Sequence, residues 1–146
     1  MPTYRCTVRA DGAADTRRAE VARAVTLAHH EVTGAPPYFP QVLFEPVPDE
    51  AVFIGGAPLA HEHVFVHGLI RDGRSAVDRR ALTERLVRDV ARAAGVDPRF
   101  VWVYLTEHPA RQMAEFGRVL PEAGEETAWT DELPEALRRF MEDRSP

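Results

Sequence analysis

The sequence repeats itself at a spacing of 61 or 62 residues, and this repeat constrains the fold more than any other feature. The spacing drops by one residue partway through, as a shortened loop in a duplicated unit would cause. Two amphipathic helices can also match by chance, but matched helix breakers at both ends favour duplication. We therefore expect two units, about 1–62 and 63–125, and an extension, 126–146, within a single domain. The matches are Arg9, Arg17-Arg18-Ala19 and Val25 with Arg71, Arg79-Arg80-Ala81 and Val87, and Gly34, Val42 and Pro48 with Gly95, Val103 and Pro109.

The first unit is predicted to form a strand, a helix and a second strand. Apolar and polar residues alternate over 3–9, which is the pattern of a strand. Apolar residues then recur every three or four positions over 17–33, which indicates a helix, and Asp15 and Thr16 are its candidate caps. A short alternating strand follows over 41–45. This order is that of a βαβ unit.

The second unit repeats the same order. A strand is predicted over 63–70 and a helix over 79–94, joined by a turn at 71–75 in which Ser75 is a candidate cap. A strand over 100–106 completes the unit. Between the two units, the apolar piece before Gly55-Gly56 predicts a hairpin or a loop.

These elements predict an α/β fold. A βαβ unit has parallel strands and a right-handed crossover, so two units give a four-stranded, mostly parallel or mixed sheet with two helices on one face. The other face has no cover and is apolar, so we expect a homotrimer with these faces inside. After the sheet, 120–130 is expected to cross the surface with Trp129 as an anchor. A C-terminal helix is expected to begin at Thr130-Asp131 and to contain Leu133, Leu137, Phe140 and Met141.

Composition excludes several classes of protein. The chain of 146 residues has a net charge of −5 and no basic tract, so neither nucleic acid nor a membrane surface is expected as a partner. No apolar run is long enough to span a membrane, and the N-terminus lacks the layout of a signal peptide, so a cytoplasmic location is expected. The single cysteine, Cys6, lies on the apolar face of the first strand and is expected to be a core residue. The chain contains no lysine, which excludes a Schiff-base mechanism through that residue type.

The first two residues suggest chemistry. Met1 before Pro2 is a favoured sequence for methionine removal, which would leave Pro2 with a free secondary amine. A free α-amine titrates at about 7.7–8.0 and can act as an acid or a base near neutral pH. A strand that begins at residue 3 would hold this amine in place. Met-Pro is also a common beginning of a chain, so other residues must support the interpretation.

A few other side chains are candidates for a site. Arg71 and Arg74 lie in one turn, where two guanidinium groups can bind a carboxylate, although solvated arginines are also ordinary in a turn. His61 and His63 form an HxH pattern, but no third ligand stands at a suitable spacing, so no metal site is expected. No GxSxG, Walker, GxGxxG or HExxH motif is present, and no cofactor is expected.

Taken together, the chain resembles the tautomerase superfamily and, within it, the cis-3-chloroacrylic acid dehalogenase family. The resemblance runs nearly end to end. Its segments are MPTY, AVTLAHHEVTG, QVLFEPVP, FIGG, FVHGLIRDGRSA, VWVYLTEHPA and QMAEFGRVLP, of which the last three are specific when combined with an N-terminal proline.

The resemblance implies a mechanism, the hydration of an activated double bond in a small unsaturated carboxylate. Arg71, Arg74 and His29 would bind the substrate carboxylate. Tyr104 and Glu115 would orient and deprotonate the attacking water, and protonated Pro2 would deliver a proton to the α-carbon. Loss of halide would then give malonate semialdehyde. The sequence departs from the family at Ile70, where a histidine is usual, and in the loop APLAHEH after Gly-Gly; we expect both near the mouth of the active site.

Alternatives to a dehalogenase remain at this stage. The same residues with a neutral Pro2 would serve an enol–keto tautomerase acting on a 2-hydroxyalkenoate or on phenylpyruvate. Decarboxylation of malonate semialdehyde is disfavoured, because that family's catalytic acid is an Asp in the second strand, and 41–45 contains none. From a different class, the chain could be a non-catalytic trimeric binding module.

Overall fold

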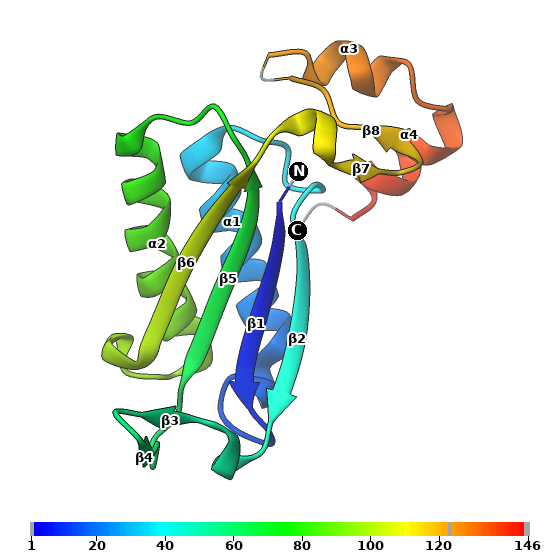
Figure 1. The fold of residues 1–146 in the computed structure, drawn as a ribbon. Helices are drawn as coiled ribbons and strands as arrows, with labels where there is room; N and C mark the ends of the chain where they lie inside the picture. Colours follow the sequence, from blue (N-terminus) through cyan, green and yellow to red (C-terminus); the bar gives the residue numbers. More distant parts are fainter. Residues whose placement is uncertain (1, 123, 145–146) are drawn as a thin grey trace.

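The computed structural model describes residues 2–122 and 124–144 and shows an α/β fold, as the sequence predicts (Figure 1). Its main sheet has four strands in the order β2-β1-β5-β6. The pairs β1–β2 and β5–β6 are parallel, and β1–β5 is antiparallel, so the sheet is mixed. The strands are β1 Thr3–Arg9, β2 Gln41–Val47, β5 Val64–Arg71 and β6 Val101–His108.

Two long helices, α1 (Arg18–Thr33) and α2 (Ala76–Ala94), pack against each other on one face of this sheet (Figure 1). Helix α2 begins three residues before the predicted start, because Ser75 caps it by accepting a hydrogen bond from the Asp78 N–H at 3.0 Å. The predicted cap of α1 is wrong. No side chain caps α1, and residues 15–17 form a 3₁₀ turn in which Thr16 Oγ1 donates to the Gly12 carbonyl instead.

The main core lies between the sheet and these helices. Alternation of side chains along the strands sends every second residue to the helix-covered face. On β1 these residues are Tyr4, Cys6 and Val8, all fully or almost fully buried. Burial raises the pKa of the Cys6 thiol to about 12, which keeps it protonated and agrees with a packing role.

Each βαβ unit ends in the same local structure. A 3₁₀ turn and a short hairpin follow both β2 and β6, at positions 61 residues apart. In the first unit the turn is Asp49–Ala51 and the hairpin pairs β3 (Phe53–Ile54) with β4 (Ala57–Pro58). In the second, the turn is Ala110–Gln112 and the hairpin pairs β7 (Ala114–Glu115) with β8 (Arg118–Val119). Even the closing hydrogen bonds correspond: Leu59 N–H to Val52 O and Leu120 N–H to Met113 O, both at 2.9 Å.

The C-terminal segment contains two short helices, α3 (Glu126–Asp131) and α4 (Glu135–Glu142). The predicted helix start at Thr130-Asp131 is wrong, because those residues belong to α3. Helix α4 begins after Pro134, whose carbonyl accepts hydrogen bonds from the Leu137 and Arg138 N–H groups at 2.9 and 3.1 Å. The segment packs through a second apolar cluster that is distinct from the main core. Trp129 is buried in this cluster, as expected of an anchor. Its buried members are Phe39, Ala110, Leu120, Trp129, Leu133 and Met141.

The face of the sheet opposite the helices carries both apolar and charged side chains. Tyr104 on β6 is 58% exposed, and Leu43 and Trp102 are also exposed. An ion pair between Arg5 and Glu45 lies on the same face. None of the described helices is long and apolar enough to cross a membrane.

A substitution at Gly68 tests how tightly Tyr4 packs against the sheet. A Cβ at this position would lie 2.7 Å from Cε1 of Tyr4, in the main core, and 2.8 Å from Cδ2 of Leu105, which packs against that core. We expect Gly68→Ala to lower the free energy of unfolding by about 1–3 kcal/mol, the usual cost of overpacking. Urea denaturation measures this change. An unaltered unfolding midpoint would show that the Tyr4 ring can shift at no cost.

Candidate active site

A pocket lies at the end of the sheet where β1 begins and β5 ends. Because β1 and β5 are antiparallel, Pro2 at the start of β1 comes next to Arg71 at the end of β5. His29 arrives from α1, and Arg74 from the turn before α2. Four of the six predicted site residues therefore line one pocket. The full lining is Pro2, His29, Ala35, Phe39, Arg71, Arg74, Pro121 and Glu126.

His29 is almost fully buried and hydrogen-bonded to Tyr4, with Nδ1 at 2.7 Å from the phenol oxygen. Burial lowers the pKa of His29 to about 3, so the ring is neutral at physiological pH. Burial also raises the pKa of Tyr4, so its hydroxyl keeps its proton. If Tyr4 donates this proton to Nδ1, the other nitrogen, Nε2, carries a hydrogen. Nε2 is buried and has no partner among the described residues, so in this tautomer it is a free donor in the wall of the pocket.

The guanidinium of Arg71 already has two partners. Nη1 donates to the Pro121 carbonyl at 2.8 Å, and Nη2 donates to the Glu126 carboxylate. The Arg71 side chain is only 10% exposed. Arg71 is thus held firmly, and a carboxylate of the chain itself offsets its charge.

Arg74 is in a different state. Its Nε is buried and has no hydrogen-bond partner among the described residues. Burial and the neighbouring Arg71 both lower the pKa of Arg74, although an arginine stays protonated in proteins. Arg74 and His29 therefore have unpaired donor groups, and an anion that enters the pocket can accept hydrogen bonds from both.

The pocket is small in this structure, with a volume of about 20 Å³, which is close to that of one water molecule. Its wall residue Phe39 also borders a wider open hollow of about 540 Å³. Glu115 of β7 lines that hollow, together with Thr3, the residue after Pro2. The pocket and the hollow thus adjoin at the beginning of β1.

Glu115 is half-buried, and burial raises the pKa of its carboxyl group. A carboxyl group of this kind is a better proton acceptor than an exposed one. The residue lies in the short hairpin β7–β8, which sequence patterns did not predict. Five of the six predicted residues therefore gather at this end of the sheet.

Tyr104 does not join them within one chain. Strand pairing places it beside His67, which pairs with Arg5, three residues after Pro2. Two strand spacings and three residues of strand put the Cα atoms of Tyr104 and Pro2 about 14 Å apart. The Tyr104 ring instead contacts Phe65 edge-on, with ring centroids 5.1 Å apart, on the open face of the sheet.

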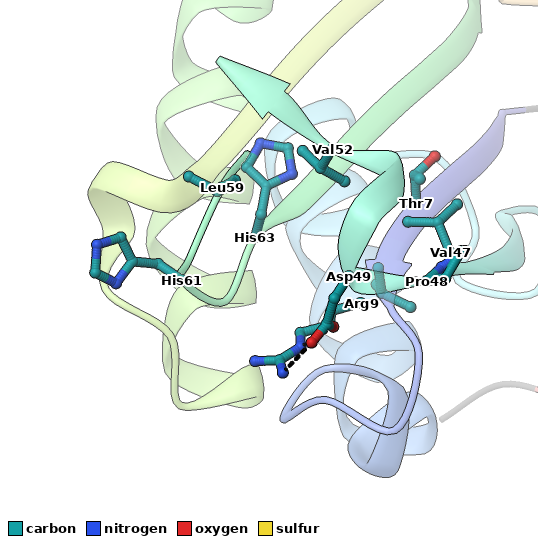
Figure 2. A pocket seen from close by; sticks show the side chains of 10 residues that line it. Thr7, Arg9, Val47, Pro48, Asp49, Val52, Leu59, His61 and His63 are labelled. Carbon is teal, nitrogen blue, oxygen red and sulfur yellow. Dashed lines mark hydrogen bonds and ion pairs between the residues drawn. The ribbon is translucent and has the colours of Figure 1, made fainter. Parts of the chain in front are cut away.

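The matching pocket at the opposite end of the sheet belongs to the first unit (Figure 2). Arg9, the counterpart of Arg71, donates to Asp49 and also pairs with Glu62 at 3.6 Å, so its charge is offset. His61 and His63 diverge here: His61 stacks on Phe100, and His63 packs edge-on against Trp102. The expectation that the loop after Gly55-Gly56 lies near the mouth of the active site is therefore wrong for a single chain.

Ile70 lies at the same end of the sheet as the pocket, directly before Arg71, because the antiparallel pairing of β1 and β5 brings this end of β5 beside the start of β1. It is fully buried on the helix-covered face of β5 and belongs to the main core. Across residues 2–122 and 124–144, no three His, Cys, Asp or Glu side chains are close enough to hold a metal ion.

Sequence reasoning missed two residues of the site. Tyr4 was recognised only as an apolar position of a strand, although a tyrosine inside a core usually needs a partner for its hydroxyl. Glu126 was part of an acidic stretch and gave no distinguishing signal. Only the fold shows that α3 brings it against Arg71.

Comparisons with known proteins agree on the family. Residues 1–132 match a family model described as "Putative oxalocrotonate tautomerase enzyme". The crystal structure of N1, a member of the cis-3-chloroacrylic acid dehalogenase family, is 36% identical, with a TM-score of 0.90 over 97% of this chain and 99% of that chain. No curated protein sequence is detectably similar.

More distant structures share the fold. An asymmetric trimer of a fused 4-OT is 20% identical, with a TM-score of 0.72 over 80% of this chain and 94% of that chain. The FG41 malonate semialdehyde decarboxylase inhibited by 3-bromopropiolate is 18% identical, with a TM-score of 0.69 over 90% of this chain and 99% of that chain.

The fold and these similarities define an enzyme of the tautomerase superfamily. Within it, the chain belongs to the cis-3-chloroacrylic acid dehalogenase family.

The Tyr4–His29 hydrogen bond makes a specific prediction. We expect Tyr4→Phe to leave buried Nδ1 without a donor and to lower the free energy of unfolding by about 1–3 kcal/mol. It should also allow the hydrogen to populate Nδ1. ¹⁵N NMR of the imidazole nitrogens measures the tautomer: the wild type should show hydrogen on Nε2 alone, and the variant a mixture. A wild-type ring with hydrogen on Nδ1 would contradict this assignment.

Proposed function

We propose that the chain is a cofactor-independent hydratase and dehalogenase of small unsaturated carboxylates, with cis-3-chloroacrylate as a representative substrate. The observation that carries the proposal is the pocket itself, where Pro2, His29, Arg71 and Arg74 meet and Glu115 lies in the adjoining hollow. Met1 lies outside the described residues, and the proposal requires its removal so that Pro2 has a free amine.

The substrate carboxylate would be bound by the unpaired donors. Arg74 supplies the positive charge, and neutral His29 supplies the Nε2 hydrogen. Both donors draw electron density toward the carboxylate, which makes the β-carbon of the conjugated double bond electrophilic. Arg71, held by Pro121 and Glu126, adds to the positive potential at the same end.

Hydration and loss of halide would then proceed in two steps. Glu115 accepts a proton from water, the water oxygen bonds to C3, and the Pro2 ammonium delivers a proton to C2. This saturates the double bond and gives a 3-chloro-3-hydroxy acid. Its C3 hydroxyl then loses a proton as the C–Cl bond breaks, giving an aldehyde, chloride and H⁺. The organic product is malonate semialdehyde.

Tyr104 can take part only if a second copy of the chain brings it to the pocket, because it is about 14 Å from Pro2 in its own chain. The homotrimer proposed from the sequence has its open sheet faces inside, which would bury Tyr104, Leu43 and Trp102. The exposure of these side chains supports self-association.

A second candidate is an enol–keto tautomerase of 2-hydroxyalkenoate or phenylpyruvate type. Tautomerisation needs Pro2 and a carboxylate-binding group, and these already meet within one chain. It does not need Tyr104, so the distance of Tyr104 from the pocket favours this candidate. Pro2 would then be neutral and would act as the base.

Chloride release separates these functions. With cis-3-chloroacrylate, we expect Pro2→Ala and Glu115→Gln each to lower kcat/KM by at least about 100-fold, the usual contribution of general acid–base groups. Ketonisation of phenylpyruvate enol that requires Pro2 but survives Glu115→Gln would favour the tautomerase. Intact mass gives the state of Met1. Retained Met1 with neither activity would favour the binding module.

The pH profile tests the role of Glu115. Its raised pKa means that the carboxylate, the form that accepts a proton, appears only above the ordinary value of 4.5 for this group. We expect kcat/KM for cis-3-chloroacrylate to fall as pH decreases through a midpoint above 4.5. Glu115→Asp should move this midpoint, while Glu122→Gln, at an exposed position, should not. A midpoint at or below 4.5 would contradict the assignment.

A further inference from the structure

Glu126 is a carboxylate of the chain that lies inside the anion-binding pocket. One of its oxygens accepts a hydrogen bond from Arg71 Nη2, and the other accepts one from the Gly124 N–H at 2.8 Å. Although burial raises the pKa of Glu126, the Arg71 guanidinium and these hydrogen bonds hold it below its usual value. Glu126 is therefore ionised at neutral pH.

The segment that carries Glu126 is anchored. Trp129, one turn further along α3, is buried, and its Nε1 donates to the Val119 carbonyl at 2.9 Å. Its ring packs edge-on against Phe39, which is itself a wall of the pocket. The carboxylate thus belongs to a packed wall.

The charges at this pocket leave one cation unpaired. Arg71 and Arg74 are cationic, His29 is neutral and Glu126 is anionic. In the proposed mechanism, the Pro2 ammonium in the pocket is balanced by the Glu115 carboxylate in the adjoining hollow. The guanidinium of Arg71 is offset by Glu126, while Arg74 Nε has no partner among the described residues. A ligand with a single carboxylate matches this balance, and a second carboxylate close to Glu126 would be repelled.

We propose that Glu126 is a specificity-determining residue, which restricts the pocket to acids with one carboxylate by occupying Arg71 and repelling a second negative charge. The inference rests on the proposed function in that it uses the same pocket. It goes further by assigning the substrate class and the residue that selects it. Nothing in the repeated sequence pattern supplies this group, because Glu126 is the first residue of the extension after the second unit.

Binding of two unreactive three-carbon acids tests the proposal without any turnover. Propionate carries one carboxylate and malonate carries two. Their dissociation constants are measured at neutral pH and low salt by calorimetry for the wild type, Glu126→Gln, Glu126→Asp and Glu125→Gln. Glu125 is the exposed neighbour, so Glu125→Gln removes the same charge from the chain outside the pocket.

The wild type should bind propionate at least as tightly as malonate. In Glu126→Gln, the affinity for malonate relative to propionate should rise at least about tenfold, because a dianion gains more than a monoanion when a nearby negative charge is removed. Glu126→Asp, which keeps the charge, and Glu125→Gln should both retain the wild-type preference. Tryptophan fluorescence, measured in a Trp102→Phe background so that Trp129 alone reports, shows whether α3 stays docked in each variant.

Several outcomes would overturn the proposal. Equal changes for both acids in Glu126→Gln, or the same altered preference in Glu126→Asp, would make Glu126 a structural residue only. A wild type that already prefers malonate would also contradict it. If neither acid binds any form, the pocket is not a carboxylate site, and the proposed function fails together with this inference.

Discussion

The antiparallel pairing of β1 with β5 is the interaction on which the rest of the site depends. Each βαβ unit alone has parallel strands, so both of its strands begin at one end of the sheet and finish at the opposite end. The two units join through β1 and β5, which run in opposite directions. The strands of the first unit therefore begin where the strands of the second unit end. Pro2 and Arg71, distant in sequence, become neighbours for this reason. Helix α1 brings His29 to the same end of the sheet, and the turn before α2 brings Arg74.

The buried ionisable groups at this end of the sheet are stabilised in three different ways. His29 is kept neutral, because desolvation disfavours the imidazolium form. Arg71 keeps its charge and shares it with a carboxylate of the chain. Arg74 keeps its charge without such a partner among the described residues, so its desolvation is the part that a bound anion can offset. At the opposite end of the sheet, the charge of Arg9 is offset twice, by Asp49 and by Glu62.

The fold was largely predictable from the sequence, because the periodicities of strands and helices are local and the repeat fixed their order. Ser75 was recognisable as a cap for the same reason. The predicted caps at Asp15-Thr16 and Thr130-Asp131 failed where short turns and Pro134 altered the local geometry. Five predicted site residues gather at one edge, but pattern alone could not show that Tyr104 faces away from it. Glu126 could not be predicted, since its importance comes from a tertiary contact of a segment with no periodic signal.

The separate apolar cluster of the C-terminal segment has a consequence for how the molecule loses order. Proteins open in cooperative units whose stabilities differ, and a unit with its own small cluster opens more readily than the main core. Phe39, Trp129 and Leu120 belong to that cluster and not to the core between sheet and helices. The wall of the pocket that contains Phe39 is thus held by the smaller of the two clusters of buried apolar side chains. We therefore expect heat or denaturant to loosen this segment before the sheet that carries Pro2 and Arg71 unfolds.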